Sequence, residues 1–177
     1  IPKEIAGLML SGILSDTLIL TSPTTTEFDR MAIDALSEIA GVDYKEYGLK
    51  MLKAGSSVKG KTKEEVLYTD YKIYPISDYR VGLGQLSTTN PDEILEEIDE
   101  YVELLNSVAD GNEYHIVALF ITDIINNGSY VICSDRGIEI LRKVYKNEKL
   151  ENGTFLSGVV SRKKQILPGI MLEMGDK

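Results

Sequence analysis

The sequence predicts an α+β protein in which an α/β-type mixed sheet is flanked by helices and preceded by three further helices. Two patterns lead to this class. Up to about residue 55, apolar residues recur at helical spacing, whereas after about residue 70 short apolar runs bounded by turn residues alternate with helical stretches. The 177 residues suffice for one complete domain and part of another.

The first helix is expected to run from Pro2, which suits a first helical turn, to about Leu20, with Pro23 ending it. Its apolar positions are Ile5, Leu8, Met9, Ile13 and Leu14. Because this apolar face is broad, we expect the helix to be buried in protein. The stretch is too short and too polar to span a bilayer comfortably, so no membrane association is expected.

The next two helices follow from signals at their ends. Thr24 and Glu27 have the spacing of a capping box, and Gly41 is a typical stop for the helix that they begin. A third helix is expected over residues 44–54. Residues 56–61 are polar and contain Gly and Ser, which predicts a linker between domains at 1–55 and 62–177.

The second part of the chain is expected to combine strands with helices. Continuous or alternating apolar runs predict strands, and apolar stripes at helical spacing predict helices. In order, the expected elements are a helix at 63–68, strands at 71–76 and 79–86, a long helix at 91–109, strands at 115–122 and 130–133, a helix at 137–145, and final strands at 154–160 and 165–172.

Composition excludes several kinds of function. The net charge of −9 argues against a basic surface for nucleic acid, so no nucleic-acid partner is expected. Cys133 is the only cysteine, which fits a reducing cytoplasmic location and predicts a small core residue rather than a nucleophile. His115 is the only histidine and falls in an expected buried strand, so this chain alone cannot build a histidine-rich metal site.

Three adjacent cations, Arg162, Lys163 and Lys164, interrupt two apolar segments that are expected to be strands. Adjacent like charges repel one another unless an anion lies among them or water screens them. A phosphate or carboxylate site would use them well, since Arg offers a planar fork and Lys a compact charge. An exposed turn would also tolerate them, so the residues alone leave both interpretations open.

Asp16 is the second unusual position, because it lies in the apolar stretch Leu14–Leu18. A carboxylate in such a place is costly unless it is paired, hydrogen-bonded or bound to a metal ion. A satisfied buried aspartate, a helix that ends just before it, and a metal ligand are all consistent with the pattern.

Several motifs, taken in order, resemble family II (manganese-dependent) inorganic pyrophosphatases, which belong to the DHH phosphoesterases. The motifs are Gly12–Leu18 with Ser22-Pro23-Thr24, then Glu38–Val42, Tyr47–Leu49, Met51–Gly55 and Val159–Gln165. The resemblance covers essentially the whole chain and concerns the C-terminal part of these enzymes. It implies that residues 1–55 are the last helices of the DHH metal-binding domain and that residues 62–177 are the DHH-associated substrate-binding domain.

The resemblance also implies functional roles. The family hydrolyses pyrophosphate to two phosphates, with two Mn²⁺ or Co²⁺ ions bound by His and Asp ligands. Arg162, Lys163 and Lys72 match the cations that bind substrate, and Asp16 matches the last metal-ligand aspartate. The supporting residues of the signature are Ser161, Lys164 and Gln165.

The Asp-His-His segment and the earlier metal ligands of the family are absent from this sequence. We therefore expect a fragment with little or no bound metal and almost no activity of its own, whose partner is the missing N-terminal DHH domain. Homodimerisation is expected only of the intact enzyme. Two alternatives stay open: a short-chain exopolyphosphatase of the same superfamily, and a non-catalytic module that binds polyanions.

Overall fold

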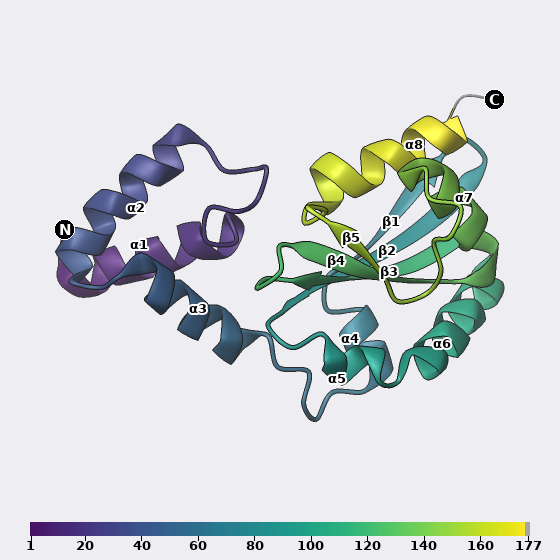
Figure 1. The fold of residues 1–177 in the computed structure, drawn as a ribbon, viewed down its shortest axis with the longest axis horizontal. Coiled ribbons are helices and arrows are strands. Elements are labelled where there is room, and N and C mark those ends of the chain that lie inside the picture. Colours follow the sequence, from purple (N-terminus) through teal and green to yellow (C-terminus); the bar gives the residue numbers. More distant parts are fainter. Residues whose placement is uncertain (176–177) are drawn as a thin grey trace. The chain divides into compact units, whose positions relative to one another are not determined.

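The computed structural model describes residues 1–175, which form two compact units, the first ending at Ser57 and the second beginning at Val58. The first unit is helical, and the second combines a sheet with helices (Figure 1). The first contains α1 (Lys3–Asp16), α2 (Glu27–Ala40) and α3 (Tyr44–Gly55). The second contains α4 (Lys63–Leu67), β1 (Tyr71–Ile76), β2 (Tyr79–Thr88), α5 (Asp92–Leu95), α6 (Ile98–Gly111), β3 (Ile116–Asp123), β4 (Gly128–Cys133), α7 (Asp135–Tyr145), β5 (Thr154–Ser157), η1 (Arg162–Ile166) and α8 (Leu167–Gly175). No helix in this described range combines the length and apolar character needed to cross a membrane.

The first unit has a small apolar core between α1 and α2. The core residues are Ala6, Leu10, Leu14, Ile33, Leu36 and Ala40. The expectation that the broad apolar face of the first helix is buried is wrong for this chain, since Ile5, Leu8 and Met9 are 48%, 71% and 47% exposed. Only Ala6, Leu10 and Leu14, at a spacing of four residues, are fully buried, because α2 and α3 together cover only part of the surface of α1.

The first helix ends at Asp16 rather than near Leu20, and Pro23 plays no part in its termination. The chain leaves the helix because Leu18–Leu20 adopt positive φ angles between 46° and 66°. This left-handed conformation costs roughly 1–2 kcal/mol per residue for L-amino acids. Hydrogen bonds of Thr17 offset part of the cost, since its hydroxyl donates to Ile13 O at 2.7 Å and accepts from the amide of the last left-handed residue at 3.2 Å.

The capping box of α2 is formed by Thr26 and Asp29, not by Thr24 and Glu27 as predicted. The hydroxyl of Thr26 accepts from Asp29 N at 3.3 Å, and Thr26 N donates to the Asp29 carboxylate at 2.8 Å. Thr24 instead shares a hydrogen bond of 2.7 Å with the hydroxyl of Ser22. Because both threonines precede an acidic residue by three positions, only the observed start of the helix separates the two possibilities.

The second unit is organised around a five-stranded sheet with the order β1-β2-β3-β4-β5. β2 and β3 are parallel, and the other neighbouring strands are antiparallel. A parallel pair requires a crossover connection, which α5 and α6 provide here. The predicted α+β class, with a mixed sheet preceded by three helices, is confirmed.

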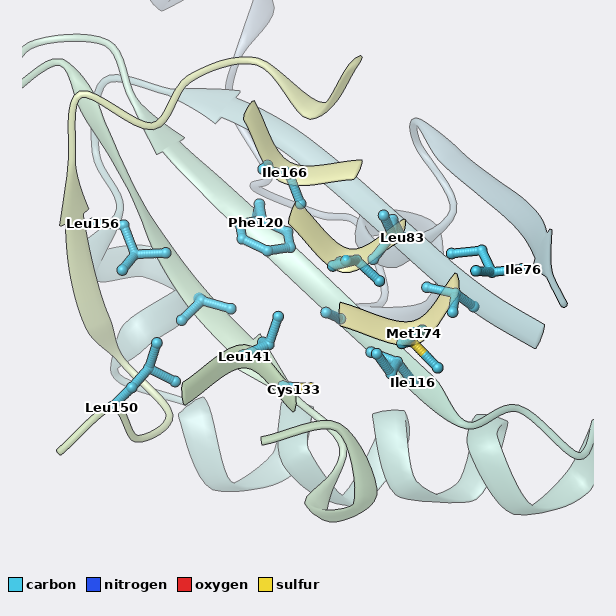
Figure 2. Close-up of a cluster of buried hydrophobic side chains, with 14 residues drawn as sticks. Ile76, Leu83, Ile116, Phe120, Cys133, Leu141, Leu150, Leu156, Ile166 and Met174 are labelled. Atoms are coloured by element: carbon cyan, nitrogen blue, oxygen red, sulfur yellow. The ribbon is translucent and has the colours of Figure 1, made fainter. Parts of the chain in front are cut away.

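Helices cover both faces of this sheet, with α7 and α8 on one face and α4, α5 and α6 on the other (Figure 1). Figure 2 shows the first of these cores, where Leu83 and Phe120 of the sheet pack with Leu141 of α7 and Ile166 of η1. The central strand β3 is buried along its whole length. Cys133 is fully buried in this core, as predicted.

The long helix predicted over residues 91–109 is two helices, α5 and α6. The backbone leaves helical geometry at Glu97, where φ is −112° and ψ is 27°. Acidic residues crowd this region, and like charges one turn apart destabilise a helix. Lys63 of α4 bonds to both Glu97 and Glu100, at 2.8 and 2.7 Å, so the break brings two carboxylates to one lysine.

The strand predicted over residues 165–172 is wrong. These residues run from η1 into α8, where Ile166, Ile170 and Met174 enter the core at a spacing of four. A short apolar run does not by itself distinguish a buried strand from a buried helix. The placement of His115 in a buried strand is also wrong, because it precedes β3 and is exposed.

Candidate functional site

The cationic segment lies between β5 and α8 rather than between two strands. It forms η1, a single π-helical turn, and Ser161 is its N-cap. The hydroxyl of Ser161 accepts a hydrogen bond from Lys164 N at 3.3 Å. Within this turn Arg162 is buried, whereas Lys163 and Lys164 are exposed, so the three cations do not share one environment.

Gln165 fixes the loop that leads into the turn. Its Oε1 accepts from Val160 N and Ser161 N, both at 2.9 Å, and its Nε2 donates to Gly158 O at 2.7 Å. Gly158 has a φ of 73°, which glycine adopts without strain and which lets the chain turn away from β5. Both atoms of the Gln165 amide are therefore engaged within the protein, Oε1 as acceptor of two hydrogen bonds and Nε2 as donor of one.

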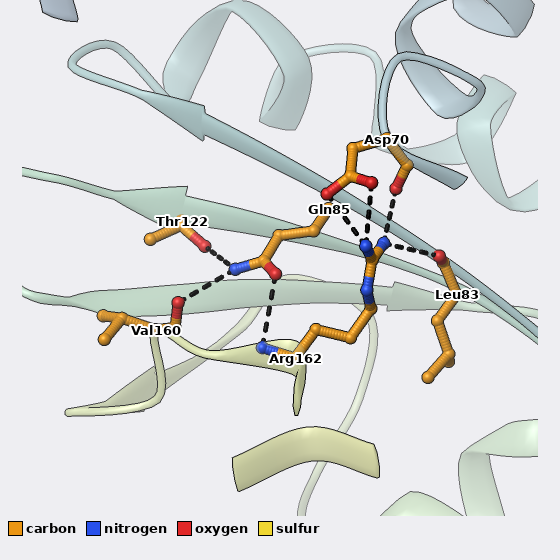
Figure 3. Close-up of polar contacts among 6 residues, drawn as sticks. All are labelled: Asp70, Leu83, Gln85, Thr122, Val160 and Arg162. Atoms are coloured by element: carbon orange, nitrogen blue, oxygen red, sulfur yellow. Dashed lines mark hydrogen bonds and ion pairs between the residues drawn. The ribbon is translucent and has the colours of Figure 1, made fainter. Parts of the chain in front are cut away.

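Beneath this loop, a row of polar side chains crosses the sheet from β2 to β4. Gln85 Nε2 donates to Val160 O at 3.0 Å and to Thr122 Oγ1 at 2.9 Å (Figure 3). The hydroxyls of Thr122 and Ser129 lie 2.9 Å apart, and Ser129 donates to Val159 O at 2.6 Å, so Thr122 is the donor to Ser129. Because both hydroxyls are fully buried, these bonds tie the cationic loop to three strands.

The guanidinium of Arg162 is engaged with the protein itself (Figure 3). Nη1 donates to the main-chain oxygens of Asp70 and Leu83, at 2.5 and 3.1 Å. Nη2 donates to both carboxylate oxygens of Asp70, at 2.7 and 2.9 Å. The Arg162 side chain is only 7% exposed, whereas that of Asp70 is 52% exposed. The fork of Arg162 thus points at Asp70 and not into open solvent.

Lys72 comes to the same edge of the sheet from a distant part of the sequence. It lies on β1 directly opposite Leu83 of β2, so the two side chains share one face of the sheet. Leu83 packs in the core under α7 and α8, and its main-chain oxygen receives Arg162. Lys72 is exposed and belongs to the face that carries η1 and Lys163.

Asp16 belongs to the first unit. It is the last residue of α1 and is exposed, and Thr24 Oγ1 donates to its main-chain oxygen at 3.4 Å. Of the explanations that the sequence left open, a buried and satisfied aspartate does not apply. The assignment of Asp16 as a metal ligand stays a prediction.

Within residues 1–175, no three His, Cys, Asp or Glu side chains gather in a way that could hold a metal ion. Asp16 offers one carboxylate, whereas catalytic metal sites in proteins usually take about three protein ligands. The described residues do not complete a metal site by themselves.

A groove of about 970 Å³ among α4, α5 and α6 is a different feature from this cationic edge. Its charged lining residues are Lys59, Lys61, Lys63, Glu64, Glu93, Glu96, Glu97, Glu100 and Glu103. Hydrogen bonds to Glu100 and Glu97 raise the pKa of Lys63 above its usual range. Carboxylates outnumber cations in this groove, so it repels phosphate-like anions.

Sequence reasoning missed Asp70 and Gln85 as parts of the site. Gln85 interrupts the apolar run of β2, which is a signal that could have found it. Asp70 precedes the predicted Lys72 by two residues, but no sequence pattern pairs it with Arg162. Thr122 and Ser129 were concealed for a similar reason, because they sit at the ends of apolar strands where small polar residues are common.

The fold and this site define a class of protein: an α+β domain that presents cationic side chains at one edge of its sheet. Cations on a rigid edge suit anions with several oxygens, such as phosphates. Residues 49–172 match the model of the DHHA2 domain, and the chain therefore belongs to the DHHA2 domain family.

Comparison with known proteins points in the same direction. A probable manganese-dependent inorganic pyrophosphatase of Lactobacillus helveticus is 42% identical over 170 residues, which are 95% of this chain and 55% of the relative. One of Staphylococcus carnosus is 44% identical, with 96% and 55% covered. The crystal structure of a candidate family II inorganic pyrophosphatase from Methanococcus jannaschii matches with a TM-score of 0.84 at 34% identity, covering 98% of this chain and 57% of that one.

The chain thus spans about half the length of the proteins that it matches. The predicted resemblance to the C-terminal part of family II inorganic pyrophosphatases is confirmed.

Proposed function

We propose that this chain is the substrate-binding C-terminal portion of a manganese-dependent inorganic pyrophosphatase, which hydrolyses diphosphate to two phosphates. The observation that carries the proposal is the shared sheet edge of Lys72, Lys163 and Arg162, which come from two distant segments. The names of the relatives supply the substrate, since the geometry alone fits any compact phosphate.

The charges at this edge suit the proposed reaction. Pyrophosphate is highly anionic, and its charge repels an attacking hydroxide. Lys72 and Lys163 are exposed and can neutralise phosphoryl oxygens, and Arg162, paired with Asp70, fixes the turn behind them. Because the supporting hydrogen bonds are already made, little reorganisation is needed as charge develops on the leaving phosphate.

In this proposal, manganese bound by the intact enzyme would supply a nucleophilic water at neutral pH. Of the described residues only Asp16 is proposed as a ligand, with the others on an N-terminal DHH domain. Accordingly, residues 1–55 are proposed as the last helices of that domain, 56–61 as a linker and 62–177 as the DHH-associated domain. A cytoplasmic location and a homodimer of the intact enzyme belong to the same proposal.

Substrate binding can be tested on the 177-residue chain with ¹⁵N-labelled protein. Titration with sodium pyrophosphate should shift the amide signals of residues 72 and 161–165 and leave those of the groove among α4, α5 and α6 in place. Lys163→Ala and Lys72→Ala should each weaken binding about tenfold, the expected loss of one charge-assisted contact. Lys146→Ala, an exposed lysine at the end of α7, is the matched control. Equal effects of all three variants, or no shifts at all, would contradict the proposal.

Activity distinguishes the alternative functions. Phosphate release from pyrophosphate with Mn²⁺, followed with malachite green, should stay near background for this chain and be rapid for a protein that also contains the DHH domain. Comparison of pyrophosphate with tripolyphosphate on that longer protein separates a pyrophosphatase from a short-chain exopolyphosphatase. Tight binding without any turnover in the longer protein would instead indicate a non-catalytic polyanion-binding module.

A further inference from the structure

Asp70 is the counterion of the buried Arg162, and it contacts Arg162 in two ways. Its carboxylate accepts two hydrogen bonds from Nη2, and its main-chain oxygen accepts one from Nη1. Together with the bond to Leu83 O, each terminal nitrogen bonds to two oxygen atoms of the protein. The terminal nitrogens of Arg162 are therefore already committed before any anion arrives.

Asp70 also joins the two cationic segments of the proposed site. It directly precedes β1, the strand that carries Lys72, and its main-chain oxygen accepts from Gln85 N at 3.1 Å. Gln85 in turn accepts from Arg162 N at 3.3 Å, at the start of the turn that carries Lys163. One residue thus fixes both the beginning of the edge strand and the end of the arginine side chain.

Because Arg162 is buried, an incoming anion cannot easily replace Asp70 as its partner. The Arg162 side chain is 7% exposed, so little of its guanidinium is open to an anion from solvent. A buried cation without a counterion is strongly unfavourable, which stabilises the pair with Asp70. Lys72 and Lys163 carry no such restriction, because both are exposed.

We infer that Asp70 is a positioning residue for pyrophosphate binding, which orients Arg162 and so holds the turn that carries Lys163 against the start of the strand that carries Lys72. The inference rests on the proposed function for the identity of the anion. Asp70 itself does not touch the substrate, since a carboxylate repels phosphoryl oxygens. In the opposite arrangement, Asp70 would compete with phosphate for Arg162, and its removal would strengthen binding.

The test compares Asp70→Asn with wild-type chain in the pyrophosphate titration. Loss of the carboxylate charge should weaken binding about tenfold. Asp70→Glu keeps the charge but lengthens the side chain by one methylene, and should weaken binding about threefold while the spectrum stays that of the folded protein. Asp78→Asn, in the turn at the other end of the β1–β2 hairpin, is the matched control and should bind like the wild type.

A second readout does not depend on pyrophosphate. Hydrogen exchange of the Arg162 and Gln165 amides should accelerate at least tenfold in Asp70→Asn and not in Asp78→Asn. If wild-type chain shows no pyrophosphate shifts, the proposed function fails while this readout still decides whether Asp70 fixes the turn. Tighter binding in either Asp70 variant, or unchanged binding and exchange in both, would overturn the inference.

Discussion

Two charged residues, Asp16 of the first unit and Arg162 of the second, are positioned in opposite ways. Asp16 is exposed at the end of a helix, and the backbone beyond it, Leu18–Leu20, is in a left-handed conformation. Arg162 is buried, and hydrogen bonds to Asp70 and Leu83 fix its guanidinium. The charge in the first unit is thus accessible to solvent, whereas the charge in the second is enclosed and fixed by side-chain hydrogen bonds.

The largest effect is expected from removing the enclosed charge. Arg162→Ala removes the donors to Leu83 O and to the Asp70 carboxylate, so the free energy of unfolding of the second unit should fall by about 3 kcal/mol. Urea unfolding followed through the NMR signals of β3 measures this loss. Lys163→Ala, the exposed neighbour, should change the same quantity by less than about 0.5 kcal/mol. Equal losses in the two variants would remove the distinction between enclosed and accessible cations.

A smaller loss is expected from the loop that supports the turn. Gln165→Leu keeps the approximate size of the side chain but leaves Val160 N, Ser161 N and Gly158 O without their partner. The free energy of unfolding of the second unit should fall by about 2 kcal/mol, with faster hydrogen exchange of the two amides. Slow exchange of these amides in the variant would show that the loop is fixed by other contacts.

Salt should separate the accessible cations from the enclosed one. Raising the ionic strength until the Debye length shortens from about 30 Å to about 8 Å should weaken pyrophosphate binding at Lys72 and Lys163 about tenfold. The protection of the Arg162 amide should stay constant over the same range, because a buried pair is screened much less. Parallel changes in both measurements would mean that Arg162 is as accessible as the lysines.

The smallest expected effect is a change in the pH dependence of stability caused by Asp29, an accessible carboxylate of the first unit. Hydrogen bonds from the Thr26 hydroxyl and then the Thr26 amide lower the pKa of Asp29 below its usual value of 3.8. A lowered folded-state pKa means that this contribution to stability is present above about pH 3.8 and is lost as the pH falls through the folded-state value. The melting temperature of the first unit should therefore fall as the pH drops through this acidic range. The fall should be smaller in Asp29→Asn. An identical pH dependence in the variant would contradict this origin.

The sequence predicted most elements because their apolar spacing is regular, and it predicted the cationic segment because adjacent cations between apolar runs are unusual. It mispredicted residues 165–172, where a run without a gap fits a strand as well as a helix. It extended α1 too far because Leu18–Leu20 continue the apolar pattern while their backbone does not continue the helix. An apolar pattern shows which residues can be buried. It does not show where the backbone leaves the helix, because that depends on contacts outside the pattern.

The candidate site was predictable in its cations but not in their environments. Arg162 and Lys163 are adjacent in the sequence, yet one is buried and the other exposed, because successive side chains of the helical turn η1 point in different directions. The counterion Asp70 lies far away in the sequence and is joined to Arg162 only when β1 and β2 are paired. Propensity and spacing describe neighbours along the chain, and a contact of this kind is set by tertiary structure.

Because Cys133 is buried, the reactivity of its thiol can report how often the core of the second unit opens. Burial raises the pKa of this thiol to about 12, so very little reactive thiolate exists at neutral pH while the second unit is closed. A thiol reagent such as dithionitrobenzoate therefore reacts only during moments when the core under α7 is open to solvent. Since Cys133 is the only cysteine, the reaction rate reports these openings without any substitution, and a ligand that closes the second unit should slow it.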